Sequence, residues 1–214
     1  ALPIFICERA QGHPLYLRYL IDLANTGTDD NGLSALPLIE GSIRNYYEAV
    51  WAGLQDDAEV VNLLSIITRL RWGISVTQFT DILNPAEQAV LVSTISRLQH
   101  LLLKPNETTI YHASFSEFLQ EKTQLMERPI QLRLTDYCQN HTDDRYGLIN
   151  IIHHGLRAGG ERTAVIVAFC DQKWIDDCVT AGANPDLLLG DIRQVLEAAT
   201  LTGNLVDTIR LLLL

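Results

Sequence analysis

Cysteine and histidine side chains are the first candidates for chemistry in this sequence, because both bind metals and act as nucleophiles. The cysteines form no Cys-x-x-Cys pair and are Cys7, Cys138, Cys170 and Cys178. The interval between the last two matches no standard zinc pattern, and the adjacent His153 and His154 point in different directions if they lie on a helix. We therefore expect no metal site, and we expect reduced structural thiols, as in a cytoplasmic protein.

Phosphate-binding and catalytic motifs are absent from the sequence. No Gly-x-x-x-x-Gly-Lys-Ser/Thr loop occurs, and none of the lysines Lys104, Lys122 and Lys173 follows a glycine. No Gly-x-Ser-x-Gly elbow and no His-Glu-x-x-His pair occur either. The Gly159-Gly160 pair lies between helical patterns without a preceding strand, which predicts a turn rather than a phosphate loop. We expect no catalytic residue and no tight nucleotide binding by this chain alone.

Two short segments have residue types that suit contact with a ligand. Gly12 and Pro14 stand at the start of an amphipathic pattern, and His112 follows a short β-prone segment. Local sequence alone also fits simpler roles. Proline suits the first position of a helix, and a histidine at such a junction can tie two elements together. The elements that position these residues therefore matter for the interpretation.

Apolar residues recur with the helix period along most of the chain. One such stripe comprises Ile43, Tyr46, Tyr47, Val50, Trp51 and Leu54. Helix-start signals occur at 75–78, 84–87 and 114–117, where Ser or Asn is followed three residues later by Gln or Glu. These patterns predict helices at 58–71, 75–83 and 86–101, and a closing helix from Ser114. The large aromatic residues are expected to anchor the core: Trp51, Trp72, Phe115, Phe118 and Trp174.

The stretch from Leu101 to Tyr111 departs from the helix period. A short apolar segment leads to a polar turn at Pro105, which is followed by a β-prone segment. This order predicts a small β-hairpin over 102–112. Three helices followed by a two-stranded wing is the order of a winged-helix domain.

The remaining patterns divide the chain into three parts. The stretch from Asn25 to Gly41 is polar and lacks periodicity, so we predict a connector there. Beyond Met126 we predict an antiparallel helical bundle or arm with helices at 127–140, 145–158, 161–170, 172–181 and 185–213, the last with a break near Gly203. We thus expect a mainly α protein made of a helical domain and linker (1–41), a winged-helix domain with a β-hairpin wing (42–125) and the arm (126–214).

Charge narrows the choice of partners. The chain has 214 residues, with 16 Lys and Arg against 26 Asp and Glu, which gives a formal net charge of −10. Such a charge repels nucleic acid and anionic lipid. No apolar run reaches the roughly 18 residues that a membrane helix needs, and no targeting segment is visible at the start. We expect a cytoplasmic protein without a membrane or nucleic-acid partner.

The order of these segments resembles the STAND signal-transducing NTPases, which include the NACHT and NB-ARC ATPases. In that family a Gly-x-Pro motif opens a helix behind the nucleotide site, and Gly12 and Pro14 match it. A winged helix follows and ends in a histidine motif, matched here by His112, Ser114, Phe115, Glu117, Phe118 and Leu119. The region from Tyr146 to Asp191 is similar to the helical segment after the winged helix in many bacterial members.

This resemblance implies the regulatory part of a nucleotide-switched ATPase. Pro14 would pack near the adenine, and His112 would donate a hydrogen bond to the β-phosphate of ADP, which holds the off state. Exchange for ATP would release the winged helix and allow assembly into a homo-oligomer, in antiviral defence, innate immunity or cell-death signalling. ATP or ADP would be the cofactor of the full-length parent, whose own nucleotide-binding and sensor domains would be the partners. The Walker A and Walker B segments are missing, so we expect this chain to be the middle piece of a longer protein.

Two other functions remain open. A helical protein–protein interaction scaffold without a nucleotide role fits the second half of the chain. A winged-helix nucleic-acid binder fits less well, since the candidate recognition helix from Pro85 to His100 has Arg97 as its one arginine.

Overall fold

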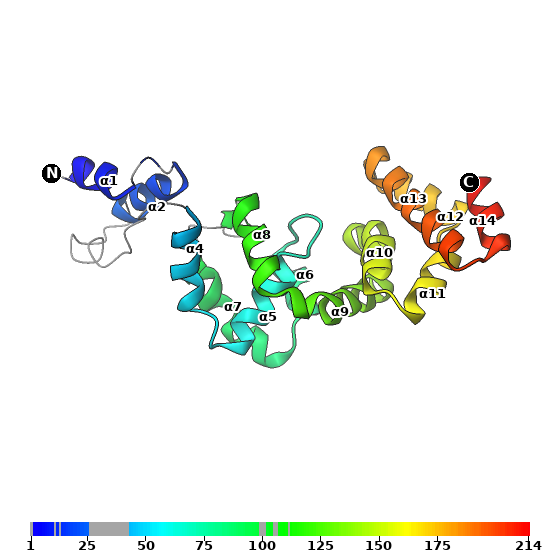
Figure 1. The fold of residues 1–214 in the computed structure, drawn as a ribbon, viewed down its shortest axis with the longest axis horizontal. Helices are drawn as coiled ribbons and strands as arrows, with labels where there is room; N and C mark the ends of the chain where they lie inside the picture. The colour runs from blue at the N-terminus through cyan, green and yellow to red at the C-terminus, as the bar shows by residue number, and fades with distance from the viewer. Residues whose placement is uncertain are drawn as a thin grey trace.

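The computed structural model of the chain describes residues 2–10, 12, 14–25, 43–98, 102–104, 107–110 and 112–214. The described part is mainly helical, as the periodicity predicts. Figure 1 shows an elongated arrangement in which the two termini lie at opposite ends of the long axis. Within the described part, no helix combines the length and the apolar character needed to cross a membrane.

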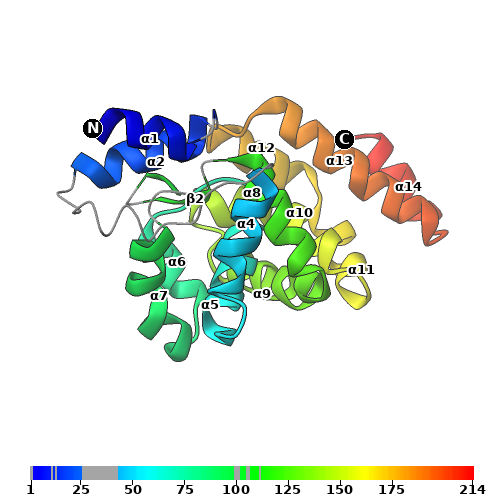
Figure 2. The same ribbon diagram turned by 60° about the vertical axis from the view of Figure 1, so that its left-hand side comes forward.

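The N-terminal part contains α1 (Leu2–Ala10), α2 (Pro14–Asn25) and α4 (Ile43–Ala52). The ring centroids of Tyr16 in α2 and Tyr46 in α4 lie 4.9 Å apart. These helices share a buried apolar cluster with α5 (Ala58–Ile67) and α8 (Ala113–Lys122), and Figure 2 shows α4 beside α8. The predicted connector at 25–41 lies, apart from its first residue, outside the described residues.

The next three helices are α5 (Ala58–Ile67), α6 (Val76–Ile82) and α7 (Pro85–Leu98). The capping box predicted at Ser75 and Gln78 is present, and the amide of Glu87 donates to Asn84 in the same manner at the start of α7. The first helix is shorter than the predicted 58–71, because the chain turns out of the helix at its C-cap, Thr68. The end of the predicted 86–101 helix lies outside the described residues.

Two short strands follow, β1 (Leu102–Lys104) and β2 (Glu107–Ile110). They pair antiparallel, with Leu102 opposite Ile110 and Lys104 opposite Glu107. The amide and the hydroxyl of Thr108 both donate to the carbonyl oxygen of Ile74, each at 3.1 Å. This contact attaches β2 to the segment that precedes α6.

The helix after the strands is α8 (Ala113–Lys122), and its start corrects one prediction. The N-cap is His112, not Ser114, so the capping box predicted at 114–117 is wrong. The Ser114 hydroxyl is already engaged elsewhere, 2.7 Å from Nδ1 of His112. Long-range contacts at Ser114 thus override the local start signal.

The second half consists of short antiparallel helices joined by tight turns. They are the 3₁₀ turn η2 (Gln124–Met126), α9 (Glu127–Asn140), α10 (Arg145–Ala158), α11 (Glu161–Phe169), α12 (Gln172–Thr180), α13 (Pro185–Leu201) and α14 (Leu205–Leu212). Gly159 and Gly160 form the predicted turn with φ values of +65° and +62°, which glycine adopts without strain. Gly203, at +70°, lies in the predicted break between α13 and α14.

One apolar core extends across both halves. Leu63 and Phe79 belong to the same buried cluster as Leu134, Trp174 and Val195. Trp51, Phe115, Phe118 and Trp174 are buried, and Trp72 is partly buried against the core. The segment from α5 to α7 and the arm therefore pack as neighbours, with α9 between them (Figure 1).

Candidate functional site

His112 is exposed at the start of α8 and has a defined orientation. Its Nδ1 lies 2.7 Å from the Ser114 hydroxyl, which in turn lies 2.9 Å from the hydroxyl of Tyr47 in α4. Burial raises the pKa of Tyr47, with the Ser114 hydrogen bond as a smaller opposing influence, so the phenol stays protonated at neutral pH. A hydrogen-bonded chain therefore connects Tyr47 through Ser114 to Nδ1, and the direction of donation along it depends on the tautomer of His112.

This hydrogen-bonded chain bears on which ring nitrogen of His112 carries the proton. When Ser114 donates to Nδ1, the neutral ring carries its proton on Nε2. Within the described part of the chain, no hydrogen bond involves Nε2. In that tautomer the imidazole presents an N–H donor at the N-terminal end of a helix, an arrangement that suits an oxyanion.

Gly12 and Pro14 lie at the junction of α1 and α2. Gly12 has a φ of +79°, and both residues are exposed. Pro14 is the first residue of α2, where its lack of an amide proton costs no hydrogen bond. Gly12 thus lies in a turn, and Pro14 begins the helix that follows it.

The helices that begin at Pro14 and His112 meet on α4. Tyr46 packs against Tyr16 of α2, while the ring of Tyr47 lies 4.8 Å from that of Phe115 in α8. Contacts among the described residues therefore join the two helices through α4, rather than through Pro14 and His112 directly. The cluster fixes the position of α8 relative to α2, but the described contacts do not assemble the three site residues into one pocket.

Sequence reasoning missed a partly buried hydrogen-bond chain between the two halves of the molecule. Nε of Arg69 donates to one carboxylate oxygen of Glu127 at 2.6 Å, and the side-chain amide Nε2 of Gln131 donates to the other at 2.9 Å. The side-chain oxygen Oε1 of Gln131 lies 2.8 Å from Nδ1 of His154, whose Nε2 lies 2.9 Å from the Tyr146 hydroxyl. This chain passes from the end of α5 through α9 into α10.

The contacts of His154 fix its tautomer. The Gln131 oxygen can only accept, because the Gln131 amide donates to Glu127. Nδ1 of His154 therefore carries the proton, and Nε2 accepts from Tyr146. Burial lowers the pKa of His154, and nearby charge on His153 and Arg157 lowers it further. His154 is a neutral structural histidine rather than a metal ligand, and the described residues contain no cluster of three metal-ligating side chains.

The buried cysteines offer no nucleophile at neutral pH. Cys138, Cys170 and Cys178 are buried and free, and burial raises the pKa of Cys170 to about 11 and that of Cys178 to about 12. Burial raises the pKa of Cys138 as well. The arrangement of these thiols is therefore that of core residues.

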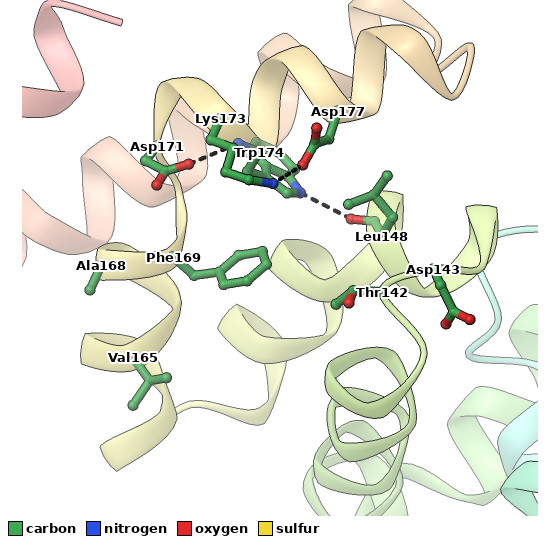
Figure 3. A pocket seen from close by; sticks show the side chains of 10 residues that line it. All are labelled: Thr142, Asp143, Leu148, Val165, Ala168, Phe169, Asp171, Lys173, Trp174 and Asp177. Atoms are coloured by element: carbon green, nitrogen blue, oxygen red, sulfur yellow. Dashed lines mark hydrogen bonds and ion pairs between the residues drawn. The ribbon is translucent and has the colours of Figure 1, made fainter.

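A separate cavity lies on the arm, away from His112. It has a volume of about 650 Å³ and opens between α10, α11 and α12 (Figure 3). Its wall includes Leu148, Phe169 and Trp174, and the Trp174 indole N–H donates to the Leu148 carbonyl oxygen at 2.9 Å. The sequence analysis identified Trp174 as a core anchor but gave no sign of a cavity beside it.

Comparisons of the chain with known protein families, with curated proteins and with solved structures found no match. The functional interpretation therefore depends on the motifs in the sequence and on the geometry described above.

Proposed function

We propose that the chain is the regulatory part of a nucleotide-switched STAND ATPase. In this proposal it holds the ADP-bound off state and transmits ligand sensing to assembly of a homo-oligomer in defence or cell-death signalling. The single observation that carries the proposal is the exposed His112 at the start of α8, whose Nδ1 is engaged by the Ser114 hydroxyl.

The elements around His112 support the proposal. Three helices, α5 to α7, precede the paired strands β1 and β2, and α8 follows at once. This is the order that the winged-helix interpretation requires, with β1 and β2 as the wing. Thr108 of β2 contacts the carbonyl of Ile74, so the strands pack on the helical part of that domain. His112 would then lie at the end of the wing, as in the STAND motif.

The chemistry of His112 suits the role of a nucleotide sensor. An N–H donor paired with a phosphate oxygen forms a charge-assisted hydrogen bond worth about 1.5–3 kcal/mol. Such a bond shifts a two-state equilibrium about ten- to hundredfold. Gly12 and Pro14 would shape the turn beneath the adenine in the full-length parent, which would supply the phosphate loop and bind ATP or ADP.

The test uses the full-length parent and the His112→Ala variant. We expect the variant to retain less ADP after purification and to assemble without its normal trigger, because one bond to the off state is lost. Nucleotide content is measured by chromatography of the released nucleotide, and assembly by size-exclusion chromatography with light scattering. His141→Ala is a matched control, since His141 is a partly buried histidine at the end of α9 whose Nδ1 contacts the Tyr137 carbonyl.

Normal ADP retention and no trigger-free assembly, in a His112→Ala protein that melts like the unmodified parent, would contradict the proposal. The melting temperature separates the two roles of His112. A merely structural histidine would lower stability and activity together, whereas a nucleotide-sensing histidine raises trigger-free activity.

A further inference from the structure

The cavity on the arm has an apolar wall with an aromatic ring turned into it. Phe169 is half-buried and extends from the end of α11 toward the middle of the cavity, as Figure 3 shows. Val165 and Ala168 continue the wall along α11, and Leu148 faces them from α10. The indole of Trp174 is held by its hydrogen bond to Leu148, so this wall is ordered before any ligand arrives.

The rim of the same cavity is acidic. Its carboxylates belong to Asp143, Asp171 and Asp177, and its one cation is Lys173. Lys173 is 82% exposed and pairs with Asp177 at 2.5 Å, an ion pair that water and salt screen. Asp143 is exposed and forms no hydrogen bond or ion pair within the described residues.

Asp171 combines a structural role with an available charge. One of its carboxylate oxygens, Oδ1, accepts a hydrogen bond from the Trp174 amide at 2.8 Å and caps α12. Asp171 is exposed, so the negative charge that it contributes faces the cavity mouth. Figure 3 places Asp171 on the same side of the cavity as Phe169 and Asp143 on the opposite side, so the negative charge beside the aromatic ring is that of Asp171.

These features select one ligand chemistry. Carboxylates at the rim attract a cation, the face of Phe169 favours a cation above it, and the apolar wall favours a hydrocarbon stem. Arginine and lysine side chains combine a positively charged head with such a stem. A phosphate or an acidic segment would be repelled by the same rim.

We propose that this cavity binds the side chain of an arginine or lysine from a basic peptide segment of a partner protein. The stem lies along Val165 and Phe169 and the charged head reaches Asp171, while Asp143 contributes negative charge from the opposite side of the cavity (Figure 3). The site is on the arm and uses none of the residues assigned to nucleotide sensing. This proposal can therefore be tested independently of the proposed ATPase function. A helical interaction scaffold would use it equally well.

The experiment titrates the purified chain with an acetylated, amidated pentapeptide that has arginine at its centre and alanine elsewhere. Two matched peptides carry lysine or the neutral isostere citrulline at the centre. Binding is followed by NMR through the indole N–H of Trp174, with the indole signals of Trp51 and Trp72 as internal references. We expect saturable shifts of the Trp174 signal with arginine or lysine, and none with citrulline.

Charge-neutralising variants locate the site. Asp171→Asn should weaken binding about two- to fivefold, as expected for an exposed ion pair, and Asp143→Asn should weaken it less, because that carboxylate acts across the cavity; added salt should weaken binding further. Asparagine at 171 can still cap α12, so the fold is preserved. Asp56→Asn changes an exposed aspartate in the turn before α5 and should leave binding unchanged.

The aromatic contribution is tested with Phe169→Leu, which keeps an apolar side chain but removes the ring. We expect weaker binding of the arginine peptide, measured at a temperature well below the melting temperature of the variant, because Phe169 also packs against the core. The proposal is overturned if the citrulline peptide binds as well as the arginine peptide, if neither cationic peptide shifts the Trp174 signal, or if Asp56→Asn weakens binding as much as Asp171→Asn.

Discussion

The guanidinium of Arg71 lies 2.6 Å from a carboxylate oxygen of Asp191, although 120 residues separate them in the chain. Arg71 lies between α5 and α6, and Asp191 lies in α13. The Arg71 side chain is 13% exposed and that of Asp191 is 1% exposed. The other oxygen of Asp191, Oδ1, is buried without a hydrogen-bond partner among the described residues. The pair therefore joins the first half of the molecule to the arm in an environment that excludes water.

Removal of one partner of this pair should be costly. Asp191→Ala leaves the Arg71 guanidinium without its counter-charge, and we expect the free energy of unfolding to fall by about 3–5 kcal/mol. Urea denaturation of the purified chain measures this change. In the double variant with Arg71→Ala, the loss should be smaller than the sum of the two single losses, because the unpaired charge is then gone.

The exposed pair between Arg44 and Glu121 provides the control. Their side chains are 53% and 59% exposed, and Glu121→Ala should change stability by less than about 1 kcal/mol. Equal losses for Asp191→Ala and Glu121→Ala would show that the Arg71–Asp191 pair has no special role.

Two adjacent histidines should make the fold sensitive to mild acid. Burial lowers the pKa of His153 to about 3, with Arg71 and Arg157 contributing, and it also lowers that of His154. Both rings are therefore neutral in the fold, whereas in the unfolded chain they take up protons below about pH 6.5. Their contribution to stability is complete above that pH, and it is lost as the pH falls toward the pKa values of the two rings in the folded state. The loss should amount to about 1.4 kcal/mol per pH unit for each ring.

Urea midpoints measured between pH 7.5 and 5 test this dependence. His153→Gln and His154→Gln should each flatten the curve, even if they lower its maximum. Burial raises the pKa of Asp191, which favours the folded state as the pH falls and so opposes the histidines. A curve with the same slope in both histidine variants as in the unmodified chain would refute the assignment.

Two helical glycines should respond to alanine in opposite directions. A Cβ at Gly147 would lie 2.1 Å from the backbone oxygen of His141, whereas a Cβ at Gly190 would meet nothing within 4 Å. Gly147→Ala must move the backbone between α9 and α10, and we expect a loss of about 1–3 kcal/mol or more. Gly190→Ala should gain about 0.5–1 kcal/mol, because alanine is the better helix former. Thermal unfolding of both variants checks the signs, and a stabilised Gly147→Ala would contradict this packing.

Ser114 should control the tautomer of His112. In Ser114→Ala the donor to Nδ1 is lost, so we expect the population with the proton on Nε2 to decrease. The ¹⁵N chemical shifts of the two ring nitrogens measure this population directly. Tyr47→Phe removes the donor one step further away and should have a smaller effect in the same direction. The ring of His141 contacts the Tyr137 carbonyl and should be unaffected. Unchanged His112 shifts in Ser114→Ala would exclude the proposed orientation by Ser114.

Local sequence predicted the helices of the arm with little error. The predicted ranges 127–140 and 145–158 coincide with α9 and α10. These helices have start and stop signals in their own residues, such as the two glycines that follow Ala158. Capping and turn chemistry operate over a few residues, so a single sequence contains the necessary information.

The long-range polar contacts could not be predicted in the same way. Arg69 and Arg71 look like ordinary charged residues at the end of an apolar helix, and nothing near them identifies Glu127 or Asp191 as partners. The predicted start of α8 was wrong for a related reason, since Ser114 contacts His112 and Tyr47 instead of capping the helix. Such contacts depend on how distant elements pack, which periodicity does not encode.

The unequal exposure of the cysteines makes the N-terminal helix a natural attachment point for a spectroscopic label. Cys7 is exposed on α1, whereas Cys138, Cys170 and Cys178 are buried. A maleimide dye should therefore attach at Cys7 without any cysteine being replaced. Fluorescence anisotropy of that dye would report how firmly α1 is held against α2, and energy transfer from a native tryptophan such as Trp51 would report a change in the distance between α1 and α4.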